Sequence, residues 1–160
     1  MWLSLVAIIA AVVAFVVYGQ AIVAGENLQI ASGSEVFYDV SADYYESMVN
    51  TVGTYSIVAI VLLGVAIVLG QFQNKVFSII TSIVRIVAPV ILMVAFLNFL
   101  NGSFTGIGWT FFSNEELVIY EEATAVGNQV IIGLVAFAVA AVVAIFSAFF
   151  AITKKVKVEE

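Results

Sequence analysis

The sequence predicts an all-α integral membrane protein whose four transmembrane helices form two tandem antiparallel hairpins. Only 10% of its 160 residues are charged and 64% are hydrophobic, whereas soluble domains carry about 25% charged residues. Four apolar runs are each long enough for a helix of about 20 residues, the length that crosses a bilayer. Polar segments separate these runs, so we expect one four-helix transmembrane domain over residues 1–160.

The first hairpin is expected over residues 1–70, with its first span at residues 1–24. Trp2 and Tyr18 lie toward the two ends of this span, where aromatic residues often mark the membrane interfaces. Small residues recur at a spacing of four, which lets helices approach closely, in the pairs Ala7 with Ala11 and Ala10 with Ala14.

A polar and aromatic segment at residues 25–50 follows the first span. Ser32-Gly33-Ser34-Glu35 has the spacing of a helix capping box. We therefore expect a helix that begins outside the membrane, near Glu35 or Ser41, and runs into the second span at residues 54–70. A break in this helix near residues 50–53 is the alternative.

A short polar link at residues 71–75 leads to the second hairpin, at residues 76–152. The third span, residues 76–100, contains Pro89, which removes a backbone donor and is expected to kink the helix. Residues 101–112 hold three glycines among aromatic side chains, which favours a flexible loop at the membrane surface.

The fourth span is the centre of the predicted architecture. A capping box at Ser113-Asn114-Glu115-Glu116 precedes an uncharged run at residues 123–152. A helix from Asn114 to Ile152 would have about 39 residues and a length of roughly 58 Å, about twice the hydrocarbon thickness. Its first turns are therefore expected outside the membrane, the other three helices are expected to pack around it, and residues 153–160 form a polar tail.

The distribution of charge predicts the orientation. With four spans, the five basic residues all fall on or near one side, and most of the eleven acidic residues fall on the other. The positive-inside rule then places both termini and the link in the cytoplasm, with loops 25–50 and 101–123 outside.

The two halves also resemble each other. At an offset of 74 residues, Val52-Gly53 aligns with Val126-Gly127, and Asn27 aligns with Asn101. Because both hairpins start on the same side, this pattern predicts a parallel internal repeat with a pseudo-twofold axis along the membrane normal. Chance matches between Val- and Ala-rich segments are the alternative explanation.

Arg85 is the one charged residue inside a predicted span, about nine residues and roughly 13 Å from its start at Val76. A charge at such a depth costs at least a few kcal/mol unless it is paired or reaches water. One interpretation is that the side chain extends to the cytoplasmic surface and meets lipid phosphate or the polar link. The other is a charge that lines a pore or pairs with another subunit.

Acidic residues follow one face of the expected outer helix, at Glu35, Asp39, Asp43 and Glu46. Carboxylate oxygens are ligands that Ca²⁺ and Mg²⁺ prefer, but the spacing is not that of an EF-hand. We interpret this acidic stripe as a solvated face that keeps the outer end of the helix in water, and we predict no metal site.

Alanines recur every four residues on the fourth span, at Ala136, Ala140, Ala144 and Ala148. In lipid, helices associate through close packing of small residues. The alanine ladder is therefore predicted to form a helix–helix seam, either within the chain or between subunits.

Composition also narrows the function. The chain has no Cys and no His, which excludes disulfides and thiolate, imidazole or His-ligated haem sites. A net charge of −6 argues against a nucleic-acid partner. No nucleophile, base and metal constellation is visible, so we predict a protein that is not an enzyme and has no catalytic residues or cofactor.

The leading hypothesis is a self-associating structural or assembly protein of a membrane, or an accessory subunit of a membrane complex, in contact with lipid. The alternative is a small oligomeric ion channel or transporter subunit with Arg85 near the path. A third is an enzyme subunit whose catalytic groups lie on another chain.

The arrangement of two strongly apolar hairpins, residues 1–70 and 76–152, resembles the coat proteins of spindle-shaped, lipid-associated archaeal viruses. Those proteins use apolar helical hairpins as repeating units. The resemblance implies a virion structural protein whose outer acidic segments form the exposed surface, and it transfers no functional residue.

Overall fold

The computed structural model describes residues 2–26, 42–72, 74–112 and 121–156. These residues form four α-helices, and no strand occurs among them: α1 (Trp2–Glu26), α2 (Ala42–Leu69), α3 (Lys75–Phe112) and α4 (Glu121–Val156). All four are long and apolar enough to cross a membrane. The prediction of an all-α membrane protein with four spans is confirmed.

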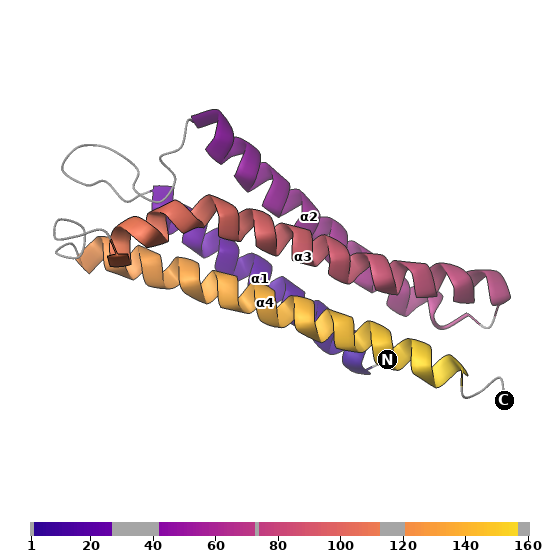
Figure 1. Ribbon diagram of the computed structural model, residues 1–160. Coiled ribbons are helices and arrows are strands. Elements are labelled where there is room, and N and C mark those ends of the chain that lie inside the picture. Colours follow the sequence, from indigo (N-terminus) through magenta and orange to yellow (C-terminus); the bar gives the residue numbers. More distant parts are fainter. Residues whose placement is uncertain (1, 27–41, 73, 113–120, 157–160) are drawn as a thin grey trace.

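The helices form an elongated bundle in which each helix runs antiparallel to the next one along the chain (Figure 1). The start of α1, the link between α2 and α3, and the end of α4 lie together at one end, which we call the terminal end. The opposite end holds the end of α1, the start of α2, the end of α3 and the start of α4.

The most extensive helix contacts join helices of different hairpins. α1 packs mainly on α4, and α2 packs mainly on α3, while α3 and α4 share a smaller contact. The contact between α1 and α2 is the least extensive of the four, and α2 diverges from the other helices toward its N-terminal end (Figure 1). The expectation that the other three helices surround α4 is therefore wrong, because α4 packs extensively on α1 and α3 only.

α2 begins at Ala42 and continues without a break through residues 50–53. This confirms a helix that begins near Ser41 and runs into the membrane. The candidate span within α2 starts at Val49, five residues earlier than predicted. The capping box that ends at Glu35 lies outside the described residues.

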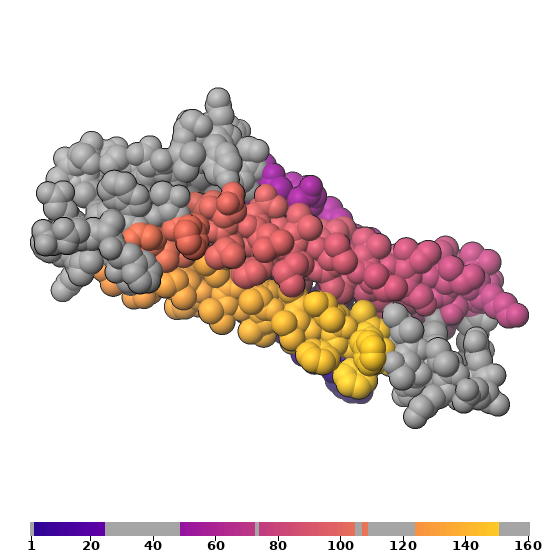
Figure 2. Space-filling view, in the orientation of Figure 1, coloured from indigo at the N-terminus to yellow at the C-terminus, as the bar shows by residue number. Residues whose placement is uncertain are grey.

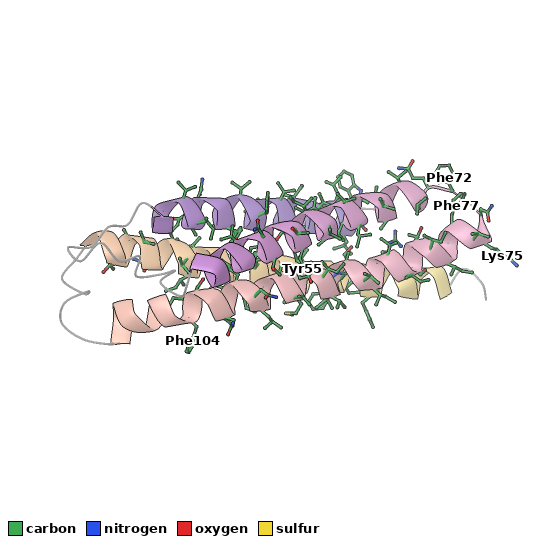
Figure 3. All side chains as sticks on the ribbon, turned by 90° about the horizontal axis from the view of Figure 1, so that it is seen from above. Tyr55, Phe72, Lys75, Phe77 and Phe104 are labelled. Carbon is green, nitrogen blue, oxygen red and sulfur yellow. The ribbon has the colours of Figure 1, made fainter. Side chains whose placement is uncertain are left out.

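The link between α2 and α3 is short and locally bonded. The N–H of Gly70 donates to the carbonyl of Ala66 at 3.2 Å. The Oδ1 of Asn74 accepts from the N–H of Val76 at 2.9 Å, so Asn74 caps the N-terminus of α3. The rings of Phe72 and Phe77 lie 5.3 Å apart at this end of the molecule (Figure 3). These contacts explain why α3 starts at Lys75.

The loop predicted at residues 101–112 is wrong, because α3 continues as a helix to Phe112. Glycine costs a helix about 1 kcal/mol relative to alanine. A backbone in hydrocarbon, however, must bond within its own segment, which favours a continued helix. Gly102 and Ser103 are buried, so packing also holds this segment in place. α3 is also continuous through Pro89, and the predicted kink stays a prediction.

α4 begins at Glu121 and ends at Val156, four residues beyond the predicted end at Ile152. The first part of the predicted helix, residues 114–120, lies outside the described residues, and so does the capping box at Ser113. The extra turn at the C-terminal end brings Lys154 and Lys155 into the helix. The internal repeat remains a prediction.

Candidate functional site

The predicted alanine ladder lies inside the chain. Ala140, Ala144 and Ala148 are buried and Ala136 is half-buried. Four alanines of α1, the helix on which α4 packs most extensively, are fully buried as well, and they are Ala7, Ala11, Ala14 and Ala21. The ladder is therefore part of a seam within the chain, where α4 packs on α1 and α3 and short side chains allow close approach of the backbones; Ala148, at its end, lines a groove with α3.

Two polar pairs fix the register of this seam. At the terminal end, the hydroxyl of Ser147 donates to the hydroxyl of Ser4 at 3.2 Å, and both residues are buried. At the other end, the Nε2 of Gln129 donates to the Oε1 of Gln20 at 3.3 Å. Hydrogen bonds between helices in a membrane contribute about 0.6 kcal/mol on average, so these pairs specify the alignment more than they stabilise it.

An aromatic cluster fills the centre of the bundle. Tyr18 from α1, Phe99 from α3 and Phe137 from α4 are 3%, 0% and 0% exposed. The ring of Tyr18 lies edge-on to Phe99 at 4.9 Å and to Phe137 at 6.0 Å, and the two phenylalanines are 6.0 Å apart. The Tyr18 hydroxyl donates to the carbonyl of Val49 at 3.4 Å, so this cluster connects all four helices.

Tyr18 was expected toward a membrane interface; its side chain is buried inside the bundle instead of facing lipid, and its level in the membrane stays a prediction. A buried tyrosine needs a partner for its hydroxyl, and the Val49 carbonyl of α2 supplies one. Trp2, in contrast, is 81% exposed at the start of α1, as an interfacial residue would be.

Gly133 of α4 leaves the space that the ring of Phe99 occupies in the aromatic cluster. A Cβ at this position would lie 3.0 Å from Cε1 and 3.3 Å from Cζ of Phe99. Such a separation is shorter than van der Waals contact between carbon atoms. The absence of a side chain at Gly133 therefore lets the Phe99 ring lie against the backbone of α4.

Arg85 reaches the C-terminal end of α2. The residue is half-buried, and its Nη2 lies 3.2 Å from the position that a Cβ on Gly70 would occupy. A helix C-terminus carries a partial negative charge from its unpaired carbonyls, which favours a nearby cation. Gly70 thus leaves space for the guanidinium at the end of α2, although the Nε of Arg85 is buried without a hydrogen-bond partner.

Arg85 lies near the terminal end of the bundle. Ser147 is level with Ser4 because their hydroxyls are bonded. Phe149, two residues later on α4, lines the same groove as Pro89 of α3, so Pro89 lies close to the level at which α1 begins. Arg85 comes about one turn before Pro89, and α3 extends past the N-terminus of α1 (Figure 1).

Counted along α3, Arg85 lies ten residues, roughly 15 Å, after the start of the candidate span at Lys75, which agrees with the depth predicted from Val76. α3 has about three turns that precede Arg85, and the start of α1 is level with a later part of α3. The guanidinium, however, lies beside Gly70, one residue past the end of the α2 candidate span at Leu69, and this placement favours the interpretation in which the side chain reaches the membrane surface. The role of Arg85 stays a prediction.

The acidic stripe is only partly covered by the structure. Glu35 and Asp39 lie outside the described residues, and Asp43 and Glu46 belong to the first turns of α2. Among the residues that the structure describes, no group of three or more Asp, Glu, His or Cys side chains gathers as a metal site would require.

Sequence reasoning missed the interior roles of Tyr18, Phe99, Phe137 and Gly133, and the contact of the exposed Gly70 with Arg85 at the end of α2. Each is common in apolar helices, and no local spacing singles it out. Their roles become visible only when the helices are packed together, as where Phe99 of α3 lies opposite Gly133 of α4.

Comparisons with protein-family models, with curated proteins and with solved structures give no match to this chain.

Proposed function

We propose that this chain is a non-enzymatic membrane protein that associates with further copies of itself as a structural or assembly unit. The observation that supports this proposal most directly is the one-sided packing of α2. α2 packs mainly on α3, and its contact with α1 is smaller than the contacts of α4 with α1 and with α3. One flank of α2 is therefore left for a partner within the membrane.

That flank carries two glycines, and we call the surface formed by Gly53, Ile57 and Gly64 the glycine flank. Gly53 and Gly64 are eleven residues apart, which is about three helical turns and places them on one face. A Cβ at either glycine would meet nothing within 4 Å, and Ile57 is exposed. Small residues on an open helix face allow a second helix to approach closely in lipid.

The packed interior of the bundle favours a structural role over an ion channel formed within one chain. Tyr18, Phe99 and Phe137 occupy the centre of the bundle. Any path for ions would therefore have to lie between copies. A repeating unit of a lipid-containing virion coat, as the hairpin arrangement suggests, is one form of such an assembly. An accessory subunit of a membrane complex is another.

The proposed orientation of the protein in the membrane rests on its basic residues. Lys75, Lys154 and Lys155 all lie at the terminal end, on α3 and α4. The positive-inside rule assigns this end to the cytoplasm and the loops that contain residues 27–41 and 113–120 to the outside.

Replacing Gly64 with leucine is expected to weaken self-association by about tenfold or more, because a loss of 1.4 kcal/mol of helix contact is enough for that change. Fold stability should change little, since the added side chain points into open space. Förster transfer between labelled copies in vesicles, measured against dilution in lipid, gives the association constant.

The control is Gly19→Leu on α1, an exposed glycine that, like Gly64, has nothing within 4 Å of its Cβ position. Equal weakening by both variants, or none by Gly64→Leu and Gly53→Leu, would refute the glycine flank as the contact.

For the channel alternative, we expect vesicles that contain the protein to pass ions no faster than protein-free vesicles, and Arg85→Leu to leave this background unchanged. Arg85 lies beside Gly70 at the end of α2 instead of along an open path. A measured ion flux that Arg85→Leu removes while the oligomer stays intact would establish the channel function instead.

A further inference from the structure

A groove of about 450 Å³ lies between α3 and α4. It belongs to the segments that can cross the membrane, Lys75–Phe104 and Thr124–Phe150, and it lies near the middle of the first and toward the C-terminal end of the second. α3 and α4 run side by side along one face of the molecule (Figure 2). The side chains that shape the groove are all apolar: Pro89, Val90 and Met93 on α3, and Ile145, Ala148 and Phe149 on α4.

The groove exists because short side chains stand where the two helices face each other. Pro89 and Ala148 fill little of the space between the backbones, and both are buried at its floor. Val90, Ile145 and Phe149 are exposed and form the rim. Because no polar side chain lines the groove, it suits a hydrocarbon ligand and has no side-chain hydrogen-bonding group for a polar ligand.

We propose that this groove binds an acyl chain of an anionic phospholipid, with the lipid phosphate beside the last turns of α4. The groove extends on α3 from Ile86 to Val94, which is roughly 12 Å along the helix. This length is close to the depth of one leaflet, about half of the 30 Å hydrocarbon core. A chain that enters from the terminal end would therefore fill the groove along its length.

The basic residues that follow the groove on α4 favour one kind of headgroup. Lys154 and Lys155 follow Phe149 on the same helix, roughly 8 Å farther toward the terminal end. The nearest acidic residues in the sequence are Glu122 before these lysines and Glu159 after them. A basic residue at a membrane surface strengthens the binding of anionic lipid by about fivefold. The cluster therefore favours an anionic over a zwitterionic phosphate.

The inference does not rest on self-association, which involves the glycine flank of α2. A helix from a second copy is the other apolar occupant that the groove admits. If a lipid fills the groove, blocking the groove should reduce the retained lipid. If a helix of a second copy fills it, blocking the groove should reduce the oligomeric mass. One experiment measures both quantities.

In that experiment the full chain in mild detergent is mixed with equal amounts of phosphatidylglycerol and phosphatidylcholine that carry the same acyl chains. Native mass spectrometry counts the lipids that each copy retains. We expect at least one retained lipid per copy, with phosphatidylglycerol preferred by about tenfold or more. The double variant Lys154→Gln/Lys155→Gln should retain lipid but lose most of the preference, about fivefold for each lysine.

Two variants fill the groove by different routes. Ala148→Leu fills the floor, and Val90→Phe, at a site that is 58% exposed, covers the groove from the rim without disturbing the core. Both variants should lose the retained lipid. The control Ala125→Leu, at an exposed alanine of α4 away from the groove, should keep it.

Equal retention of the two lipids by the unmodified chain would overturn the proposal. Retention unchanged in both groove-filling variants would do so too. A drop in oligomeric mass in these variants, with lipid retention intact, would assign the groove to a helix of a second copy.

Discussion

Replacement of Phe99 by alanine is expected to lower the free energy of unfolding of the bundle by roughly 2–3 kcal/mol. Phe99 is fully buried and contacts the rings of Tyr18 and Phe137. In water, the loss of a buried phenyl ring combines the cost of a cavity with the lost transfer of apolar surface. In lipid the transfer contribution is small, because acyl chains are as apolar as the core, so the cavity and the lost contacts account for the effect.

The measurement is an unfolding titration with sodium dodecyl sulfate in mixed micelles, followed by circular dichroism and tyrosine fluorescence. Leu97→Ala is the matched control, since Leu97 lies on the same helix and is 52% exposed to lipid. Its stability should change by a few tenths of a kcal/mol at most. If both variants lost the same stability, the aromatic cluster would not be the core of the bundle.

Gly133→Val is expected to destabilise the bundle by roughly 2 kcal/mol, although valine has a higher helix propensity than glycine. The new Cβ would lie 3.0 Å from the Phe99 ring, which is held in turn by Tyr18 and Phe137. The ring cannot move without opening this cluster, so the added atoms overpack the core. The same titration measures the effect.

Gly19→Val serves as the control for helix propensity, because a Cβ at Gly19 meets nothing within 4 Å. It should leave stability unchanged or raise it slightly. The double variant Gly133→Val/Phe99→Leu should recover part of the loss, because leucine lacks the ring atoms that meet the new side chain. Equal effects of the two glycine substitutions would contradict the close contact between α3 and α4.

The spans themselves could be predicted from the sequence because hydrocarbon imposes a simple requirement. A segment such as residues 1–24 or 123–152 must be apolar over about 20 residues to cross the bilayer, and composition alone reveals that. The same physics explains the error at residues 101–112. Glycine and aromatic residues mark loops in water, but a chain in or near lipid satisfies its backbone by staying helical.

The choice of helix partners could not be predicted in the same way. Ala140 and Ala144 indicate a close approach, but alanines on α1 and on a second copy are equally suitable partners. The choice of α1 as the partner of α4 depends on contacts between distant residues. Ser4 bonds to Ser147, and the Tyr18 ring packs on Phe99 and Phe137. The depth of Arg85 along α3 agrees with the predicted one, but its contact with Gly70 could not be predicted, because that contact depends on how α2 and α3 pack.

The most direct test of a self-associating membrane unit is the mass of the protein extracted with its lipids in mild detergent, measured by native mass spectrometry and mass photometry. We predict homo-oligomers or extended arrays made of this chain alone, and a shift toward smaller species in Gly64→Leu. A monomer at every concentration, with lipid retained, would contradict the proposal.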